Sequence, residues 1–340
     1  MKYLFVLFVL IFFLFCGYSQ KDKINGMSLV SINKPLSKKH IDPLVHIHSN
    51  YAAVIPFGFK STINGTSIAF DLQNQWYGET SAGIKSTIKL LQDQDIKIML
   101  KPQIWVWNGS YTGDIKMKNE EDWLLLEAAY TKFITLYAQI AADAGVELFC
   151  VGTELKQFAA SRPEYWRTLI KDIRVIYKGK LTYAANWDEY VKVRFWEDLD
   201  YIGIDAYFPV SFKRTPSVTE CKKGWKKNFT AIKYLAKAYD KKILFTEFGY
   251  RSVDYTGKEP WNSHNEIAKV NLEGQKNATQ ALMELFWNQD WFAGGFLWKW
   301  FPENEKAGGV DDSRFTPQNK PVLEVVKSFY NNYSASPENK

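Results

Sequence analysis

Cysteine and histidine are both scarce in this sequence, which has 3 Cys and 4 His among 340 residues. The histidines are His40, His46, His48 and His264. His46 and His48 do not lie at the end of a predicted strand, and no close spacing of Cys and His suggests a zinc site. The sequence therefore predicts neither a metal nor another cofactor, and it argues against a metal-dependent hydrolase.

The sequence also lacks a run of charge of one sign, a linker, a low-complexity segment and a short-period repeat. Its formal net charge is +6, but the lysines are interleaved with acidic residues and form no basic stripe. This pattern is typical of a solvated surface and predicts no nucleic-acid partner. With 46% hydrophobic residues, the chain has ordinary globular composition and enough length for one large core.

One long apolar run is present, over residues 3–15, and it is too short for a membrane span. Lys2 precedes it, and the small residues Gly17 and Ser19 stand at the −3 and −1 positions of a cut before Gln20. We therefore expect a signal peptide over 1–19, export to the periplasm or beyond, and a mature domain over 20–340. The alternative is a lipid-anchored cell-surface protein modified at Cys16, with membrane contact only in that case.

Short apolar runs alternate with longer stretches of helical periodicity along the rest of the chain. The predicted strands cover residues 27–32, 52–56, 96–101, 147–151, 181–185, 201–204, 243–247 and 294–298. The predicted helices cover 81–94, 120–144, 163–177, 220–239, 266–288 and 321–330. Such alternation predicts an α/β fold with a parallel sheet, here a (β/α)8 TIM barrel in a single domain. The rival is a doubly wound sheet, which favours a glycine-rich first turn, and residues 33–36 contain no glycine.

Two glutamates stand just after buried apolar runs, in FCVGTELKQF (149–158) and FTEFGYRS (245–252). Glu154 follows the fourth predicted strand and Glu247 ends the seventh, so in a barrel both carboxylates can point into the space at its mouth. Two carboxyl groups about 5–5.5 Å apart can hydrolyse a glycoside with retention of configuration. One is then kept ionised, with Tyr207 or Arg251 as candidate partners, and the other has a raised pKa. The alternative is structural: each glutamate pairs with a nearby cation or caps a helix.

Other strand ends carry candidate glycan-binding residues, and the 13 Trp include several of them. Trp298 ends the eighth predicted strand, two residues before Trp300, so one or both can form a floor under a sugar. Trp105 and Trp107 share one direction after the third strand, and Trp105 is the preferred platform. Each also has a plain structural interpretation as a packed aromatic residue.

Polar candidates follow the same logic. Asn186, after the fifth strand, is either a sugar ligand or a turn residue. Tyr207, after the sixth, either donates to the nucleophile or packs as an aromatic residue. Asp205 either supports the site or caps a loop, and Lys101 is either a cation near the site or a salt-bridge partner within the barrel.

The chain resembles glycoside hydrolase family 113, the β-mannanase-like group within the clan of retaining (β/α)8 glycoside hydrolases. The resemblance is carried by VGTEL (151–155), NWDEY (186–190), YIGIDAYFP (201–209), FTEFGYRS (245–252) and GFLWKWFPE (295–303). It implies that Glu154 is the acid/base, that Glu247 is the nucleophile, and that the enzyme acts on β-1,4-mannan or manno-oligosaccharides. Most members of the clan carry Asn before the acid/base, whereas this chain has Thr153, which leaves open how a sugar 2-hydroxyl is held.

Three other functions are alternatives to this one. The same two glutamates can act on another β-linked glycan. A secreted carbohydrate-binding barrel without catalysis is a second alternative, although both glutamates are present. A barrel hydrolase of phosphoesters is a third, and it lacks the expected metal ligands.

Overall fold

The computed structural model describes residues 23–262 and 269–334, and its centre is a closed barrel of eight parallel strands. In order around the barrel the strands are β1 (Ile24–Leu29), β10 (Phe292–Trp300), β9 (Ile243–Phe248), β8 (Ile202–Asp205), β7 (Lys180–Asn186), β6 (Leu148–Thr153), β4 (Lys97–Leu100) and β2 (Tyr51–Val54). The predicted (β/α)8 barrel is confirmed and the doubly wound sheet is wrong. The predicted signal peptide lies outside the described residues.

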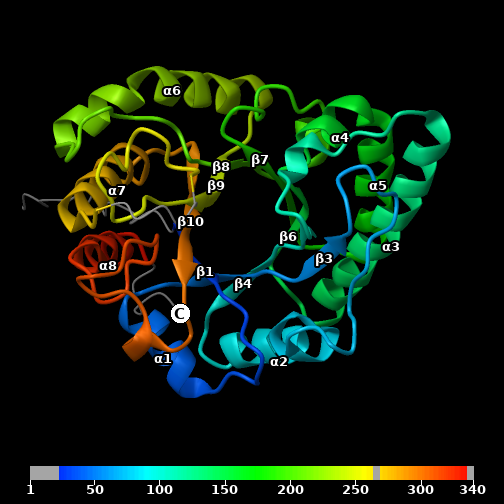
Figure 1. Ribbon diagram of the computed structural model, residues 1–340, viewed down its shortest axis with the longest axis horizontal. Coiled ribbons are helices and arrows are strands. Elements are labelled where there is room, and N and C mark those ends of the chain that lie inside the picture. Colours follow the sequence, from blue (N-terminus) through cyan, green and yellow to red (C-terminus); the bar gives the residue numbers. More distant parts are fainter. Residues whose placement is uncertain (1–22, 263–268, 335–340) are drawn as a thin grey trace, which may run out of the picture.

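Helices surround the barrel, as Figure 1 shows. They are α1 (Lys38–His46), α2 (Ser81–Gln92), α3 (Glu120–Asp143), α4 (Lys156–Ser161), α5 (Pro163–Ile176), α6 (Val218–Tyr239), α7 (Leu272–Phe286) and α8 (Val322–Asn332). Short 3-10 turns are η1 (Tyr77–Glu79), η2 (Thr112–Asp114), η3 (Trp196–Asp198) and η4 (Asn304–Lys306). In the described part of the chain, no helix combines the length and apolarity needed to cross a bilayer.

The core has two parts, one inside the barrel and one between its strands and the helices. The interior cluster consists of Ile24, Ala53, Ile55, Met99, Leu148, Leu244, Ala293 and Phe296. Strands β1, β6 and β9 are buried along their whole length, which explains why β6 and β9 begin with consecutive apolar residues rather than an alternating pattern.

Two helices were not predicted. Helix α1 contains Pro43, a residue that disfavours helix interiors, and α4 has only 6 residues, too few to show a helical period. Helix α7 begins later than the predicted residue 266, because the side chain of Asn271 caps it by accepting from the Gly274 amide at 2.8 Å. Residues 266–268 of that prediction lie outside the described residues.

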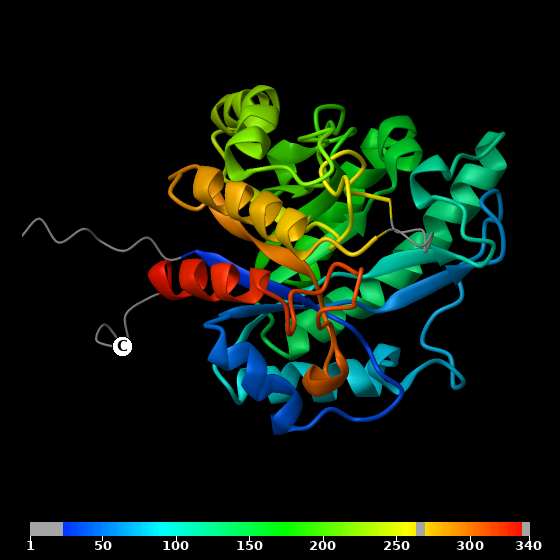
Figure 2. The same ribbon diagram turned by 60° about the vertical axis from the view of Figure 1, so that its left-hand side comes forward.

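A small parallel sheet prolongs two barrel strands beyond the mouth. It consists of β3 (Phe57–Lys60), which follows β2, and β5 (Gln103–Val106), which follows β4. One face packs on α3, where a Cβ added to Gly58 would lie 2.7 Å from the Phe133 ring. Ile104 and Val106 are buried, whereas Gln103 and Trp105 lie on the opposite, more exposed face. Figure 2 shows the two strands reaching out from the barrel.

Candidate active site

Glu247 lies in β9 with both carboxylate oxygens occupied by donors. Its Oε1 accepts from Lys101 Nζ at 2.5 Å and from Gln103 Nε2 at 2.9 Å. Its Oε2 accepts from the Tyr207 hydroxyl at 2.8 Å, which is the contact that the position of Tyr207 predicted. The residue is buried, and three donors, one of them cationic, hold its two carboxylate oxygens in place.

Lys101 is fully buried and serves a second carboxylate as well. Its Nζ lies 3.7 Å from Oδ2 of Asp205, whose Oδ1 accepts from the Thr246 hydroxyl at 2.7 Å. Burial lowers the pKa of Lys101, but the charges of Asp205 and Glu247 outweigh burial and raise it above the usual range. Burial raises the pKa of Asp205 to about 7, against the opposing effect of Lys101. Lys101 is therefore both a site cation and a barrel salt-bridge partner.

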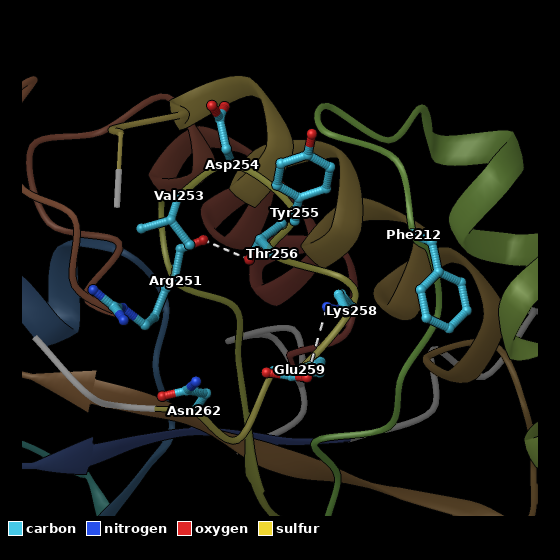
Figure 3. Close-up of a pocket in the computed structure, with 10 residues that line it drawn as sticks. Phe212, Arg251, Val253, Asp254, Tyr255, Thr256, Lys258, Glu259 and Asn262 are labelled. Carbon is cyan, nitrogen blue, oxygen red and sulfur yellow. Dashed lines mark hydrogen bonds and ion pairs between the residues drawn. The ribbon is translucent and has the colours of Figure 1, made fainter. Parts of the chain in front are cut away.

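Arg251, the other candidate partner of Glu247, is not among the donors that reach it in the described residues. Its Nε donates to the Ser313 carbonyl at 3.2 Å. Arg251 instead lines a cavity of about 430 Å³, formed mainly by the segment after β9. Figure 3 shows Phe212, from the segment after β8, facing this segment. Neither glutamate is among the residues that line that cavity.

Glu154 directly follows β6 and has a left-handed backbone with φ of +52°. Such a conformation costs a non-glycine residue roughly 1–2 kcal/mol, so its surroundings must hold it. Its amide donates to the Ala184 carbonyl of β7 at 2.8 Å. Burial, and then the negative charges of Asp205 and Glu247, raise the pKa of Glu154 well above its usual range. The charge of Glu247 therefore acts on Glu154, but the two environments differ. Hydrogen-bond donors surround Glu247, whereas burial and negative charges act on Glu154.

Asn186 and Tyr111 form a pair beside Glu154. Asn186 Nδ2 donates to the Tyr111 hydroxyl at 2.7 Å, and its Oδ1 accepts from the Trp187 amide at 2.8 Å. Burial and then the charge of Glu154 raise the pKa of Tyr111, which places this hydroxyl within electrostatic reach of the carboxyl group. Asn186 is thus a turn residue that also orients a neighbour, and its role as a sugar ligand stays a prediction.

Sequence reasoning missed Tyr111 and Gln103. Tyr111 lies in an irregular segment before η2, where no periodicity indicates its direction. Gln103 offered a usable signal, because it stands two residues after Lys101 and alternation along an extended chain sends both side chains to one side.

An exposed row of aromatic residues continues from Gln103 along the same face. Trp105 is 50% exposed and Trp107 is 66% exposed. The Trp107 ring stacks on Phe59, with ring centroids 5.1 Å apart and an interplanar angle of 18°. We call Phe59, Trp105 and Trp107 the aromatic ledge. Its exposed flat faces can accept the apolar faces of sugar rings.

The two tryptophans of β10 have different environments. Trp298 is partly exposed and packs on the cluster inside the barrel. Trp300 is fully buried in the outer core, so it cannot form a sugar floor. Simple alternation fails here because Met27 pairs with Leu297 and Leu29 with Trp300, an irregularity that inserts one extra residue into β10.

The comparisons agree with this architecture. The sequence model of Glycoside Hydrolase Family 113 matches residues 30–320. The chain belongs to glycoside hydrolase family 113. It is therefore a glycoside hydrolase, and the resemblance seen in its sequence motifs is confirmed. No curated protein matches the chain.

Solved structures share its fold, and they include mannanases of this family. The β-mannanase AaManA from Alicyclobacillus acidocaldarius is 24% identical, with a TM-score of 0.81 over 92% of this chain and 98% of that one. A β-1,4-mannanase of the family is 23% identical, with a TM-score of 0.78 over 91% and 99%. A β-glucuronidase from Faecalibacterium prausnitzii is 12% identical, with a TM-score of 0.62 over 92% of this chain and 49% of that one.

Thr153, which replaces the clan's usual Asn, turns its hydroxyl toward the protein. Its Oγ1 donates to the Pro102 carbonyl at 3.5 Å and lies 3.8 Å from Cys150 Sγ. Thr153 is buried, and these contacts engage its hydroxyl with other protein groups.

Proposed function

We propose that this enzyme hydrolyses β-1,4-mannan or manno-oligosaccharides with retention of configuration, with Glu247 as nucleophile and Glu154 as acid/base. The observation that carries the proposal is the contrast between the two carboxyl groups. Glu247 is bound by Lys101, Gln103 and Tyr207, whereas burial and neighbouring negative charges raise the pKa of Glu154. A retaining mechanism requires this division between an ionised and a protonated carboxyl group.

The reaction then proceeds in two displacements. Glu247 attacks the anomeric carbon while the bond from that carbon to the leaving oxygen breaks, and Glu154 gives its proton to this oxygen. In the second step Glu154 takes a proton from water, the water oxygen attacks the same carbon, and the ester bond to Glu247 breaks. Both carboxyl groups return to their starting states, and no metal or cofactor takes part in this scheme.

The choice of mannan rests on family membership and on the mannanases among the similar structures. Its test is product analysis with β-1,4-manno-oligosaccharides and cello-oligosaccharides side by side. Cleavage of the manno-series alone supports the proposal. Cleavage of the cello-series alone retains the mechanism and replaces the substrate with another β-linked glycan. If a broad glycan panel is bound but not cleaved, the protein is a carbohydrate-binding barrel.

We also propose that the protein is exported to the periplasm or beyond, with residues 1–19 removed. The support is the sequence order of Lys2, the apolar run 3–15 and the small residues Gly17 and Ser19. The intact mass of the protein from its native host tests this proposal, and a chain beginning at Gln20 is expected. A lipid-modified N-terminus at Cys16 would instead indicate an anchored protein.

A further inference from the structure

Glu189 is another buried carboxyl group within electrostatic reach of Glu154, and it has no part in the proposed mechanism. Glu189 follows β7 in a turn, where its amide donates to the Asn186 carbonyl at 2.9 Å. The residue is 2% exposed, and burial raises its pKa to about 8. Its Oε1 accepts from the Tyr183 hydroxyl at 3.1 Å, whereas Oε2 has no hydrogen-bond partner within residues 23–262 and 269–334. A buried carboxyl group with one partner calls for an explanation.

Tyr183 connects Glu189 to the backbone beside Glu154. Tyr183 is fully buried in β7, and its hydroxyl accepts from the Leu155 amide at 2.9 Å while donating to Glu189. Leu155 directly follows Glu154, whose own amide donates to Ala184 of the same strand. Two consecutive amides are therefore tied to β7, one directly and one through the Tyr183 hydroxyl.

The acceptor on Glu189 determines how the Tyr183 hydroxyl is oriented. A phenol has one hydrogen, and it can offer a lone pair to Leu155 only while that hydrogen points elsewhere. Glu189 Oε1 accepts that hydrogen. The segment that this arrangement holds includes the left-handed backbone of Glu154, which requires support from its neighbours.

We propose that Glu189 is a positioning residue for Glu154, acting through the Tyr183 hydroxyl that it orients. This inference rests on the proposed role of Glu154 as acid/base. A small displacement of a catalytic group costs rate while leaving substrate binding almost intact. We therefore expect a loss of rate mainly with substrates whose leaving group must take a proton from Glu154.

The test uses two substrates that differ in their need for an acid. In a manno-oligosaccharide the leaving group is a sugar hydroxyl oxygen, which needs a proton to depart. In a 2,4-dinitrophenyl glycoside of mannobiose the leaving group is dinitrophenolate, which departs with little protonation. We expect Tyr183→Phe and Glu189→Leu to lower kcat/KM about tenfold or more on the oligosaccharide, mainly through kcat, and several-fold less on the aryl glycoside. Glu189→Gln keeps an acceptor oxygen, so it is expected to restore most of the oligosaccharide rate.

Tyr177→Phe provides a matched control, because the Tyr177 hydroxyl donates to the Val146 carbonyl at 2.8 Å, just before β6 begins. It is expected to lower Tm without changing the ratio of kcat/KM between the two substrates. Equal losses on both substrates, or a Gln variant as slow as the Leu variant, would overturn the positioning role while the wild type remains active. A wild type that cleaves neither substrate would instead overturn the proposed function, and this inference with it.

Discussion

Lys101 Nζ and Glu247 Oε1 lie 2.5 Å apart across the barrel mouth, brought together from the end of β4 and from β9. The same ammonium group lies 3.7 Å from Asp205 at the end of β8. Lys101 and Asp205 are fully buried. One cation thus balances two carboxylates in a place where an unpaired charge would be costly.

Replacing Lys101 by Met tests this balance. The variant leaves Asp205 and Glu247 without a buried cation, and we expect it to lose about 3–5 kcal/mol of unfolding free energy. If it folds, its kcat should fall, because the candidate nucleophile loses a cationic hydrogen-bond donor that holds its Oε1. Denaturant unfolding and steady-state kinetics measure the two effects. Lys156→Met, which breaks the more exposed pair with Asp188, is the control and should cost at most about 1 kcal/mol.

The sequence alone predicted the elements of the site that depend on strand ends. Glu154, Tyr207 and Glu247 each stand where a buried apolar run stops, and in a closed parallel barrel such ends converge by geometry. Lys101 was recognised by the same signal, with its two interpretations left open. Their placement follows from topology, although their catalytic roles stay predictions.

Features that depend on tertiary context were not predictable in this way. The pairing of β3 with β5 requires two segments more than 40 residues apart, each with only 4 residues. The irregular register of β10, which buries Trp300, depends on β1 at the other end of the chain. Tyr111 reaches the site from an irregular segment. The hydrophobic periodicity within a single helix or strand does not indicate any of these three features.

Azide can separate the roles of the two glutamates. Replacing either Glu154 or Glu247 by Ala should reduce oligosaccharide hydrolysis about 100-fold or more. With a dinitrophenyl glycoside, Glu154→Ala plus azide should give a β-glycosyl azide, because azide attacks the covalent intermediate in place of activated water. Glu247→Ala plus azide should give the α-glycosyl azide by a single displacement. Identification of the two products by NMR makes the assignment, and exchanged products would reverse it. Glu147→Gln is the control and should remain active. Glu147 lies just before β6, where its Oε2 accepts from the Ile98 amide of β4.

The alkaline limb of the pH profile should report the proton on Glu154. Burial comes first among the causes that raise its pKa, followed by the charges of Asp205 and Glu247. Asp205→Asn removes one of these negative charges, so Glu154 should ionise more readily and the alkaline limb of kcat/KM should move to lower pH. Asp188→Asn changes a carboxylate that pairs with Lys156 and should leave the limb in place. A limb that stays fixed in Asp205→Asn would mean that another group sets it.

The aromatic ledge should make binding depend on glycan length. Gln103 reaches Glu247, and side chains on one face of a strand recur about every 6.8 Å, so Trp105 lies one step and Trp107 two steps from the candidate nucleophile. Trp105→Ala should therefore weaken short and long manno-oligosaccharides alike. Trp107→Ala should raise KM about tenfold for long substrates and spare the shortest ones. Only a long glycan reaches the Trp107 ring, so only a long glycan loses an apolar contact when the ring is removed.

Kinetics over a series of chain lengths measure this difference. Tyr234→Ala is the control, because it removes an aromatic side chain that is 74% exposed on α6 and should change no substrate. Equal effects of Trp107→Ala at every length would place that residue next to the cleavage point. No effect at any length would mean that the glycan leaves the cleft by another side. A loss confined to long chains would show that the β3–β5 sheet extends the binding surface, as cleavage within a polymer requires.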